Sequence, residues 1–287
     1  MIKDQIDRFF AYARERETIR LRKLAGDPLP WTSDPILAHY RFCNVRREHD
    51  RVTEWFRENV RDPMRDDPGV VLATFIFRWF NRIETGKILL EHNLLADWNV
   101  ARARGALHDV APLVTGAFMI KTPTGLRKLE GIISIVERYI DMGLADRTWY
   151  DCKTLQSAWN VTCAAPFMGD FMSYELVTDL RHTACLEDAS DILTWANPGP
   201  GCMRGLDRMH GDPVPTRGTA KSRHWDGMQL AMQQLLELSG LPENWPPEWG
   251  AWEMREVEHT LCEFDKYERT RLREGRPKKK YRPGAPS

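Results

Sequence analysis

Four titratable side chains recur at helical spacing near the C-terminal end of the sequence. Within residues 251–269, AWEMREVEHTLCEFDKYER, they follow one another at i, i+3, i+7 and i+10 and are Glu256, His259, Glu263 and Lys266. Residues at this spacing share one face of an α-helix. Carboxylates, an imidazole and an ammonium group on one face can perform general acid–base chemistry. Salt-bridged surface helices have the same composition, so the spacing leaves both interpretations open.

Cys262 lies next to this stripe and allows two interpretations. It is either a buried thiol or a thiolate that His259 and Lys266 activate. A metal site built from His259, Cys262 and Glu263 lacks a fourth ligand, and we therefore predict no metal. The six cysteines include no CxxC pair, which excludes a zinc ribbon and indicates reduced thiols.

A second group of side chains, made of arginines and asparagines, could bind anions. If residues 41–56 form a helix, four polar side chains fall on one face: Arg41, Asn44, Arg47 and Arg51. Arg78 and Asn81 repeat the Arg–Asn spacing of i, i+3. Guanidinium groups can bind two phosphate oxygens at once. A solvated helix face with i, i+4 ion pairs explains the same pattern without a ligand.

Residues 197–209, NPGPGCMRGLDRM, predict a tight turn between two helices. Its three glycines, Gly199, Gly201 and Gly205, would expose backbone N–H groups that can hold a phosphate of nucleic acid at a helix N-terminus. Arg204 favours the anion contact because it adds a positive charge. A plain helix–helix turn would use the same glycines and is the alternative.

The elements that must position these side chains are nearly all helical. Apolar periodicity and breaker residues predict helices over 4–24, 33–60 (with or without a break), 70–84, 97–107, 125–142, 154–161, 167–180, 186–196, 223–239 and 249–272. Ser33 and Asp34 resemble a helix cap. A strand over 70–84 stays open because that stretch is rich in β-branched residues. Residues 208–222 predict a surface loop, and the expected fold is all-α and multi-helix.

Composition excludes several classes of protein. The chain has 287 residues, of which 42% are hydrophobic, with 41 basic and 41 acidic side chains. This argues against a disordered chain and against a general polyanion binder. No apolar stretch reaches 18 residues and no signal core is present, so we expect a cytoplasmic protein without membrane contact. Neither GxxxxGK[ST] nor a GxGxxG after a strand occurs, and we expect no cofactor.

The neutral total hides a segregation of charge. Residues 269–283 carry eight basic side chains and one acid, whereas residues 243–265 carry seven acids and one arginine. The basic segment therefore predicts a local anion contact beside a carboxylate-rich segment. We expect one helical catalytic domain over 1–275, with or without two lobes and a cleft between them, and a basic flexible tail over 276–287.

Five strings follow one another along the chain: YRFCNVRREHDRVTEWF (40–56), FRWFNRIETG (77–86), PFMGDFMSYELVTDLR (166–181), NPGPGCMRGL (197–206) and EVEHTLCEFDKYER (256–269). Together they resemble the alpha-glutamyl/putrescinyl thymine pyrophosphorylase family, over residues 35–270. This family includes phage amino-acid:DNA transferases and the helical domain associated with 5-hydroxymethyluracil DNA kinases. The resemblance implies a multi-helix fold similar to helix-hairpin-helix DNA glycosylases.

The resemblance also implies an activity, the hypermodification of thymine in phage DNA. The phosphate or pyrophosphate on a 5-hydroxymethyluracil base would be replaced by the amine of an amino acid or polyamine. The implied partners are double-stranded DNA with the phosphorylated base, the free amine, and a DNA kinase of the same pathway. An enzyme that acts on a base inside duplex DNA must flip it out of the stack.

Roles for individual residues follow from the same resemblance. The DNA backbone would be held by Gly199, Gly201, Arg204 and Gly205. Phosphate and substrate binding would fall to Arg41, Asn44, Arg47, Arg51, Arg78, Asn81, Asp170 and Tyr174. The amine would be handled by Glu256, His259, Glu263 and Lys266, with Glu263 or His259 as the base. In a covalent variant of the reaction, Cys262 adds to C6 of the pyrimidine.

Two functions from other classes stay open. A non-catalytic helical module would bind DNA and deliver it to a separate kinase. A DNA glycosylase would excise the modified base, but it needs a carboxylate, and often a lysine, soon after its hairpin. Asp207 follows closely, whereas Asp212 and Lys221 fall in the predicted loop, which disfavours excision.

Overall fold

The computed structural model describes residues 1–287 except 118–119, 145–148, 150, 213–224, 278 and 282–287. Among the described residues the fold is all-α, as predicted, and the sole β pairing there is an isolated bridge between Tyr40 and Lys280. The chain divides into two compact units, residues 1–50 with 192–287 and residues 51–191. Most of the predicted loop 208–222 lies outside the described residues.

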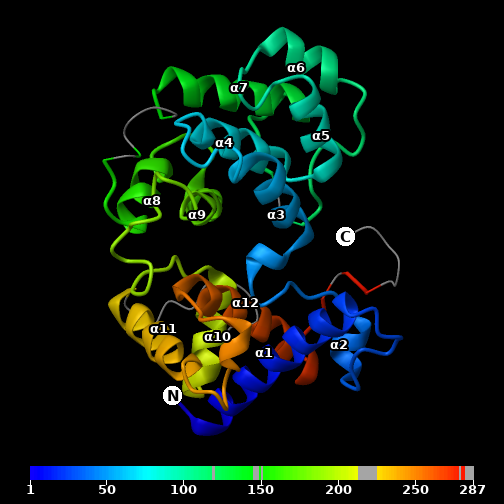
Figure 1. The fold of residues 1–287 in the computed structure, drawn as a ribbon, viewed down its shortest axis with the longest axis vertical. Helices are drawn as coiled ribbons and strands as arrows, with labels where there is room; N and C mark the ends of the chain where they lie inside the picture. The colour runs from blue at the N-terminus through cyan, green and yellow to red at the C-terminus, as the bar shows by residue number, and fades with distance from the viewer. Residues whose placement is uncertain (118–119, 145–148, 150, 213–224, 278, 282–287) are drawn as a thin grey trace. The chain divides into compact units, whose positions relative to one another are not determined.

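The first unit contains seven described helical elements (Figure 1). They are α1 (Lys3–Leu24), α2 (Pro35–His39), a 3₁₀ turn (Arg47–His49), α10 (Pro200–His210), α11 (Trp225–Ser239), a second 3₁₀ turn (Pro247–Trp249) and α12 (Met254–Arg271). Its core includes an aromatic cluster in which Phe9 packs edge-on against Phe10, Trp252 and Phe264. Such edge-to-face contacts are the favoured geometry of aromatic pairs and fix α1 against α12 and the segment before it.

Two glycines bring α10 and α12 into close contact. A Cβ atom at Gly205 would lie 2.6 Å from the backbone carbonyl oxygen of Leu261, and one at Gly201 would collide with the Cys262 sulfur. Only glycine therefore fits at either position while the two helices keep this distance. Gly201 and Gly205, two of the three glycines predicted to form a DNA-binding hairpin, lie inside α10 and face α12.

The hairpin itself departs from the prediction, because no helix precedes it. Residues 186–196 form successive turns followed by extended chain, and Gly199 is the N-cap residue of α10. Within this stretch, the Asp191 carboxylate accepts the N–H groups of Leu155 and Gln156 at the start of α8.

The helix predicted over 33–60, with or without a break, forms only near its two ends, over Pro35–His39 and from Arg51 onward. It begins as expected, with the Asp34 carboxylate capping α2 through the N–H groups of Ile36 and Leu37, but α2 ends at His39. Residues 41–46 are irregular, and the N–H groups of Arg41, Cys43 and Asn44 bind acceptors other than the carbonyl four residues back. Cys43 N–H donates to the carboxylate of Glu263, for example. Tertiary hydrogen bonds thus replace the helical ladder.

The other helices of the described residues lie in the second unit: α3 (Arg51–Phe56), a π-helical turn (Arg57–Arg61), α4 (Val70–Phe80), α5 (Ile83–Glu91), α6 (Val100–Leu107), α7 (Lys128–Asp141), α8 (Leu155–Cys163) and α9 (Gly169–Leu180). The apolar stretch 70–84 is helical, which excludes the strand alternative. It breaks at Asn81, which adopts the left-handed conformation with φ of 45° and ends α4. Asparagine tolerates this conformation better than most residues.

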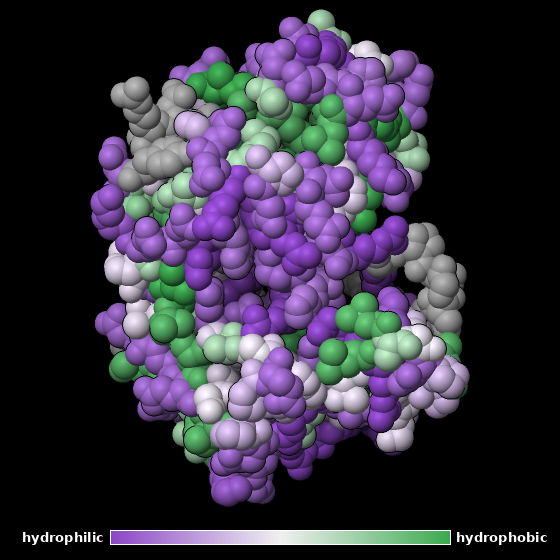
Figure 2. Space-filling view, in the orientation of Figure 1, coloured by the Kyte–Doolittle hydropathy of each residue, from purple (hydrophilic) through white to green (hydrophobic). Residues whose placement is uncertain are grey.

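The face shown in Figure 2 is mainly hydrophilic, with hydrophobic side chains distributed among the polar ones. Single exposed apolar residues of this kind are normal for a folded domain. None of the described helices combines the length and the apolar composition that crossing a bilayer requires.

Candidate functional site

The stripe predicted on α12 meets the irregular segment 40–50 through Glu263 and Lys266. Glu263 Oε2 accepts the Cys43 N–H at 2.9 Å and the Lys266 ammonium at 2.7 Å. The Lys266 nitrogen also lies 4.6 Å from the centre of the Phe42 ring, a cation–π distance. The pair is not sealed off, because 12% of the Glu263 side chain and 23% of the Lys266 side chain are exposed. It can therefore reach a ligand.

Hydrogen bonds within segment 40–50 fix its path. The Asp50 carboxylate accepts the Asn44 N–H at 3.0 Å, and the Asn44 side chain donates to the His49 carbonyl at 2.6 Å. From α1, Arg16 donates to the Cys43 carbonyl at 3.0 Å and to the Asn44 side-chain oxygen at 2.7 Å. The amide of Asn44, a predicted phosphate ligand, thus binds the loop itself.

His259 lies near Cys43 and Asp50. One ligand-type atom of each side chain, the Cys43 sulfur, a carboxylate oxygen and a ring nitrogen, lies within 4.8 Å of the other two. The Nε2 atom of His259 is buried and makes no hydrogen bond within the described part of the chain. Sequence analysis missed Arg16, Cys43 and Asp50 as members of this cluster, because a helix over 33–60 would not have formed the loop that gathers them.

The pKa values of the cluster members shift in different directions and for different reasons. Burial lowers the pKa of His259 although Asp50 and Glu263 oppose it, so the imidazole is neutral at pH 7. Burial acts to raise the pKa of Glu263, but Lys266 and His259 outweigh it and the pKa falls below its ordinary value. Glu263 is thus an ionised carboxylate. Burial raises the pKa of the Cys43 thiol well above its ordinary value.

Glu256 of the predicted stripe and the neighbouring Cys262 lie outside this cluster. Glu256 accepts the Glu253 N–H at 2.9 Å in a capping box that begins α12. Cys262 faces Gly201 of α10, and burial raises the pKa of its thiol far above the ordinary value. A protonated, packed thiol is a poor nucleophile, so the geometry lends no support to the covalent variant.

The predicted phosphate ligands are dispersed over both units. Arg41 donates its backbone N–H to Lys279, and Arg47 is buried near His259 and Asp50. Arg51 begins α3 with an exposed side chain. The common helix face expected for these arginines therefore does not form.

In the second unit, Arg78 is 2% exposed and binds the carboxylate of Asp179, itself 1% exposed, through Nε and Nη2. Its Nη1 donates to the Asn81 side chain at 2.6 Å. This pair joins α4 to α9 in the core. Also on α9, Tyr174 is buried, whereas Asp170 is exposed and accepts the Trp159 indole N–H through its carbonyl.

Arg204, the predicted DNA-binding arginine, binds Asp265 of α12 at 2.8 Å. Arg208 and Arg269 bind the same fully buried carboxylate at 3.0 and 3.2 Å. Arg204 and Arg208 extend from α10 and fasten it to α12 through this carboxylate, whereas Arg269 belongs to α12 itself. The role of Asp265 was not foreseen, since its sequence neighbours give no sign of it.

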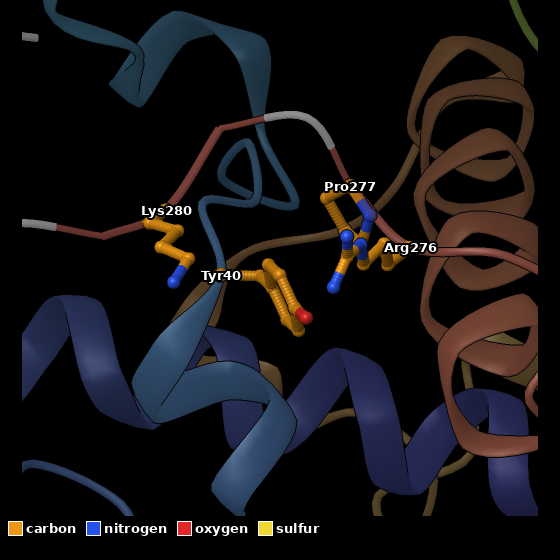
Figure 3. A pocket seen from close by; sticks show the side chains of 4 residues that line it. All are labelled: Tyr40, Arg276, Pro277 and Lys280. Carbon is orange, nitrogen blue, oxygen red and sulfur yellow. The ribbon is translucent and has the colours of Figure 1, made fainter.

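An open pocket of about 410 Å³ lies beside Tyr40 and is lined by Tyr40, Arg276, Pro277 and Lys280 (Figure 3). Part of the segment predicted to be a flexible tail thus has a described position. Its backbone pairs with residues 39–41, since Arg41 N–H donates to Lys279 and Tyr281 N–H donates to His39. The pocket combines an aromatic ring with two cations.

Comparison of the sequence with known proteins shows which family the chain belongs to. Residues 3–276 match the family model described as the helical domain of 5-hmdU DNA kinase. The chain belongs to this family. The resemblance to 5-hydroxymethyluracil kinase-associated helical domains, stated from the sequence, is thereby confirmed. The likeness to helix-hairpin-helix glycosylases stays a prediction.

One relative of this helical-domain family is the 5-hmdU DNA kinase of Bacillus phage SP10. It is 28% identical to the chain over 290 aligned residues, which cover 91% of the chain and 44% of the phage protein. The chain thus spans less than half the length of this relative. No solved structure matches the chain.

Proposed function

We propose that the chain is a transferase that modifies thymine-derived bases in phage DNA. It would replace the phosphate on a 5-phosphomethyluracil base with the amine of an amino acid or polyamine. The relative named as a 5-hmdU DNA kinase supports a place in 5-hydroxymethyluracil chemistry, because phosphorylation of that base would supply the leaving group. The observation that carries the proposal is the partly exposed Glu263–Lys266 pair in the cluster with segment 40–50.

The proposed reaction forms one C–N bond and breaks one C–O bond. The amine attacks the exocyclic carbon of the base, and the phosphate leaves with the bonding electron pair. An ammonium ion and a phosphate dianion become a secondary ammonium and hydrogen phosphate, so one proton passes from nitrogen to phosphate oxygen. Net charge and atoms balance without a cofactor.

Glu263 and Lys266 suit the two ends of this reaction. Glu263 is ionised at pH 7, so it can bind the incoming ammonium and take the proton that the nitrogen must lose. Its Oε2 holds both described contacts, which leaves Oε1 for the amine. Lys266 would offset the negative charge of the departing phosphate. Glu263 is the better candidate base because part of its side chain is exposed, whereas the Nε2 atom of His259 is buried.

Mass analysis of nucleosides tests the proposal. Duplex DNA that contains 5-phosphomethyluracil is incubated with the protein and, in turn, glycine, glutamate or putrescine, and is then digested. We expect a nucleoside with the mass of the amine adduct and release of inorganic phosphate. Free modified base would instead indicate a glycosylase. That outcome is disfavoured because Asp207, the acid after the turn, is buried in α10.

Substitution of the pair gives the first prediction. Glu263→Gln should lower turnover by about 10²- to 10⁴-fold, since it removes the proton acceptor. Lys266→Met should lower turnover as well, with phosphate release reduced in parallel. Glu248→Gln is the matched control, because Glu248 is an exposed carboxylate in the neighbouring 3₁₀ turn and should retain full rate. Equal rates for all three variants would contradict the assignment.

A second function has support of its own. The matched helical domain accounts for 44% of the phage kinase, so a domain of this family can accompany another activity in one chain. The chain would then be a DNA-binding module without turnover. Tight binding of modified duplex in a gel-shift assay, with unchanged nucleosides for every amine, would favour this function over transfer.

A further inference from the structure

We propose that Cys43, Asp50 and His259 bind a divalent transition-metal ion, with zinc as the first candidate. This set differs from the one that sequence analysis rejected, which combined His259 with Cys262 and Glu263. The cluster exists because segment 40–50 is irregular and brings two of its own side chains to His259 on α12.

The spacing of the three groups suits one small ion. Their ligand atoms lie within 4.8 Å of one another. Zinc binds sulfur at about 2.3 Å and nitrogen or oxygen at about 2.0–2.2 Å, which places tetrahedral ligand atoms roughly 3.5 Å apart. Small side-chain rotations therefore suffice to close the set around an ion.

The donor types point to the kind of metal. A thiolate, an imidazole and a carboxylate are ligands that zinc accepts, whereas magnesium and calcium prefer oxygen ligands alone. The buried Nε2 of His259 has no hydrogen-bond partner among the described residues, which is a second and independent sign of a missing ligand. Asp50 uses Oδ1 for the Asn44 N–H, so Oδ2 is the oxygen that can bind an ion.

Surrounding hydrogen bonds hold the ligands in place. Arg16 binds the carbonyl of Cys43, and Glu263 accepts the Cys43 N–H, so the backbone at the sulfur ligand is held from two sides. Such outer contacts orient metal ligands and tune their affinity. Three protein ligands leave a fourth tetrahedral position for water or an added ligand, the arrangement of catalytic zinc sites.

Metal binding does not rest on the proposed transferase function, and its test needs neither DNA nor an amine. The full-length protein is stripped with a chelator, dialysed and titrated with Co²⁺. We expect one equivalent to bind, with the strong visible absorption of tetrahedral cobalt and a near-ultraviolet thiolate-to-cobalt band, both removed by added Zn²⁺.

Substitutions of two proposed ligands, compared with substitution of Cys262 on α12, test which side chains bind the metal. Cys43→Ser should abolish the thiolate band, and His259→Ala should weaken cobalt binding by about a hundredfold or more. Cys262→Ser is the matched control and should keep the band, because that sulfur faces α10. Absence of cobalt absorption in the folded wild type, or a band that disappears with Cys262→Ser instead, would overturn the proposal.

A measurement on the wild type guards against variants that fail to fold. Saturating Zn²⁺ should protect Cys43 from alkylation by iodoacetamide, as mapped by peptide mass spectrometry. Cys152 and Cys163, which are partly exposed in the second unit, serve as internal controls and should react equally with and without zinc. Equal alkylation of Cys43 under both conditions would also overturn the proposal.

Discussion

Glu256 and Glu263 lie two turns apart on α12, and their surroundings shift their carboxyl pKa values in opposite directions. Burial raises the pKa of Glu256, which caps its own helix, whereas Lys266 and His259 keep the pKa of Glu263 low despite its burial. The stripe seen in the sequence thus divides into a structural acid and a charged acid next to a cation. Spacing alone could not separate them, since both occupy the same helix face.

Glu256→Gln should isolate the effect of the buried charge. The folded pKa of Glu256 lies above its ordinary value of 4.5, so the folded state holds the proton more tightly than the unfolded chain. The resulting stability is complete below the unfolded pKa and is lost as the pH rises through the folded pKa. The free energy of unfolding of wild type minus that of Glu256→Gln should therefore fall as the pH rises above the ordinary value of 4.5.

Urea titrations at several pH values measure this difference. Glu256→Ala, which also removes the acceptor of the capping box, should destabilise the protein by about 1 kcal/mol at every pH relative to Glu256→Gln. A wild-type minus Glu256→Gln difference that stays constant with pH would refute the assigned pKa direction.

At the scale of elements, local pattern predicted the helices that carry a clear apolar stripe, among them α1, α7 and α12. It failed over 40–50, where Cys43 N–H binds a carboxylate 220 residues away. Such a partner leaves no trace in local periodicity, so neither the irregular segment nor its cluster of Cys43, Asp50 and His259 could be predicted. The predicted turn between two helices did not form, and the helix-packing role of Gly201 and Gly205 depends on α12 as a neighbour.

The contact between α10 and α12 yields a stability prediction. Gly205→Ala should lower the free energy of unfolding by about 1–3 kcal/mol, because its Cβ would press on the Leu261 carbonyl and the backbone must move. Gly227→Ala in α11 is the control, since a Cβ there meets nothing within 4 Å, and it should be neutral or stabilising by about 0.5 kcal/mol.

Gly201→Ala provides a contrast in the same denaturation experiment. Its added Cβ meets chiefly the side chain of Cys262, so the double variant with Cys262→Ala should recover part of the missing stability. Cys262→Ala should not restore the stability that Gly205→Ala loses. Comparable rescue of both glycine variants would show that the clash is not as local as the structure indicates.

At the scale of the whole molecule, part of the balance between basic and acidic side chains comes from ion pairs inside each unit. Many arginines are bound within their own unit, including those around Asp265 and the Arg78–Asp179 pair. These cations neutralise buried carboxylates and hold helices together. The C-terminal segment differs, because Arg276 and Lys280 line an open pocket. It is the better candidate for contact with a polyanion.

Truncation after Gly275 tests this assignment. The shortened protein should bind duplex DNA more weakly, and the slope of log K against log salt concentration should become less steep by about 0.9 for each DNA phosphate that the protein no longer neutralises. Truncation after Tyr281 is the matched control, since it keeps Arg276, Lys280 and the pairing with residues 39–41. Indistinguishable affinity and salt slope for both truncations would contradict a DNA contact at the pocket.

The glycines of α10 also bear on how sequences of this family diverge. Gly205 lies against the backbone of Leu261, so no side-chain change in α12 can make room for a larger residue there. Gly201 faces the Cys262 side chain, and this pair can change together. Homologous chains should therefore retain glycine at position 205 and show covariation between positions 201 and 262. Within about one turn of α10, one glycine position should thus be invariant and the other should vary together with a position on α12.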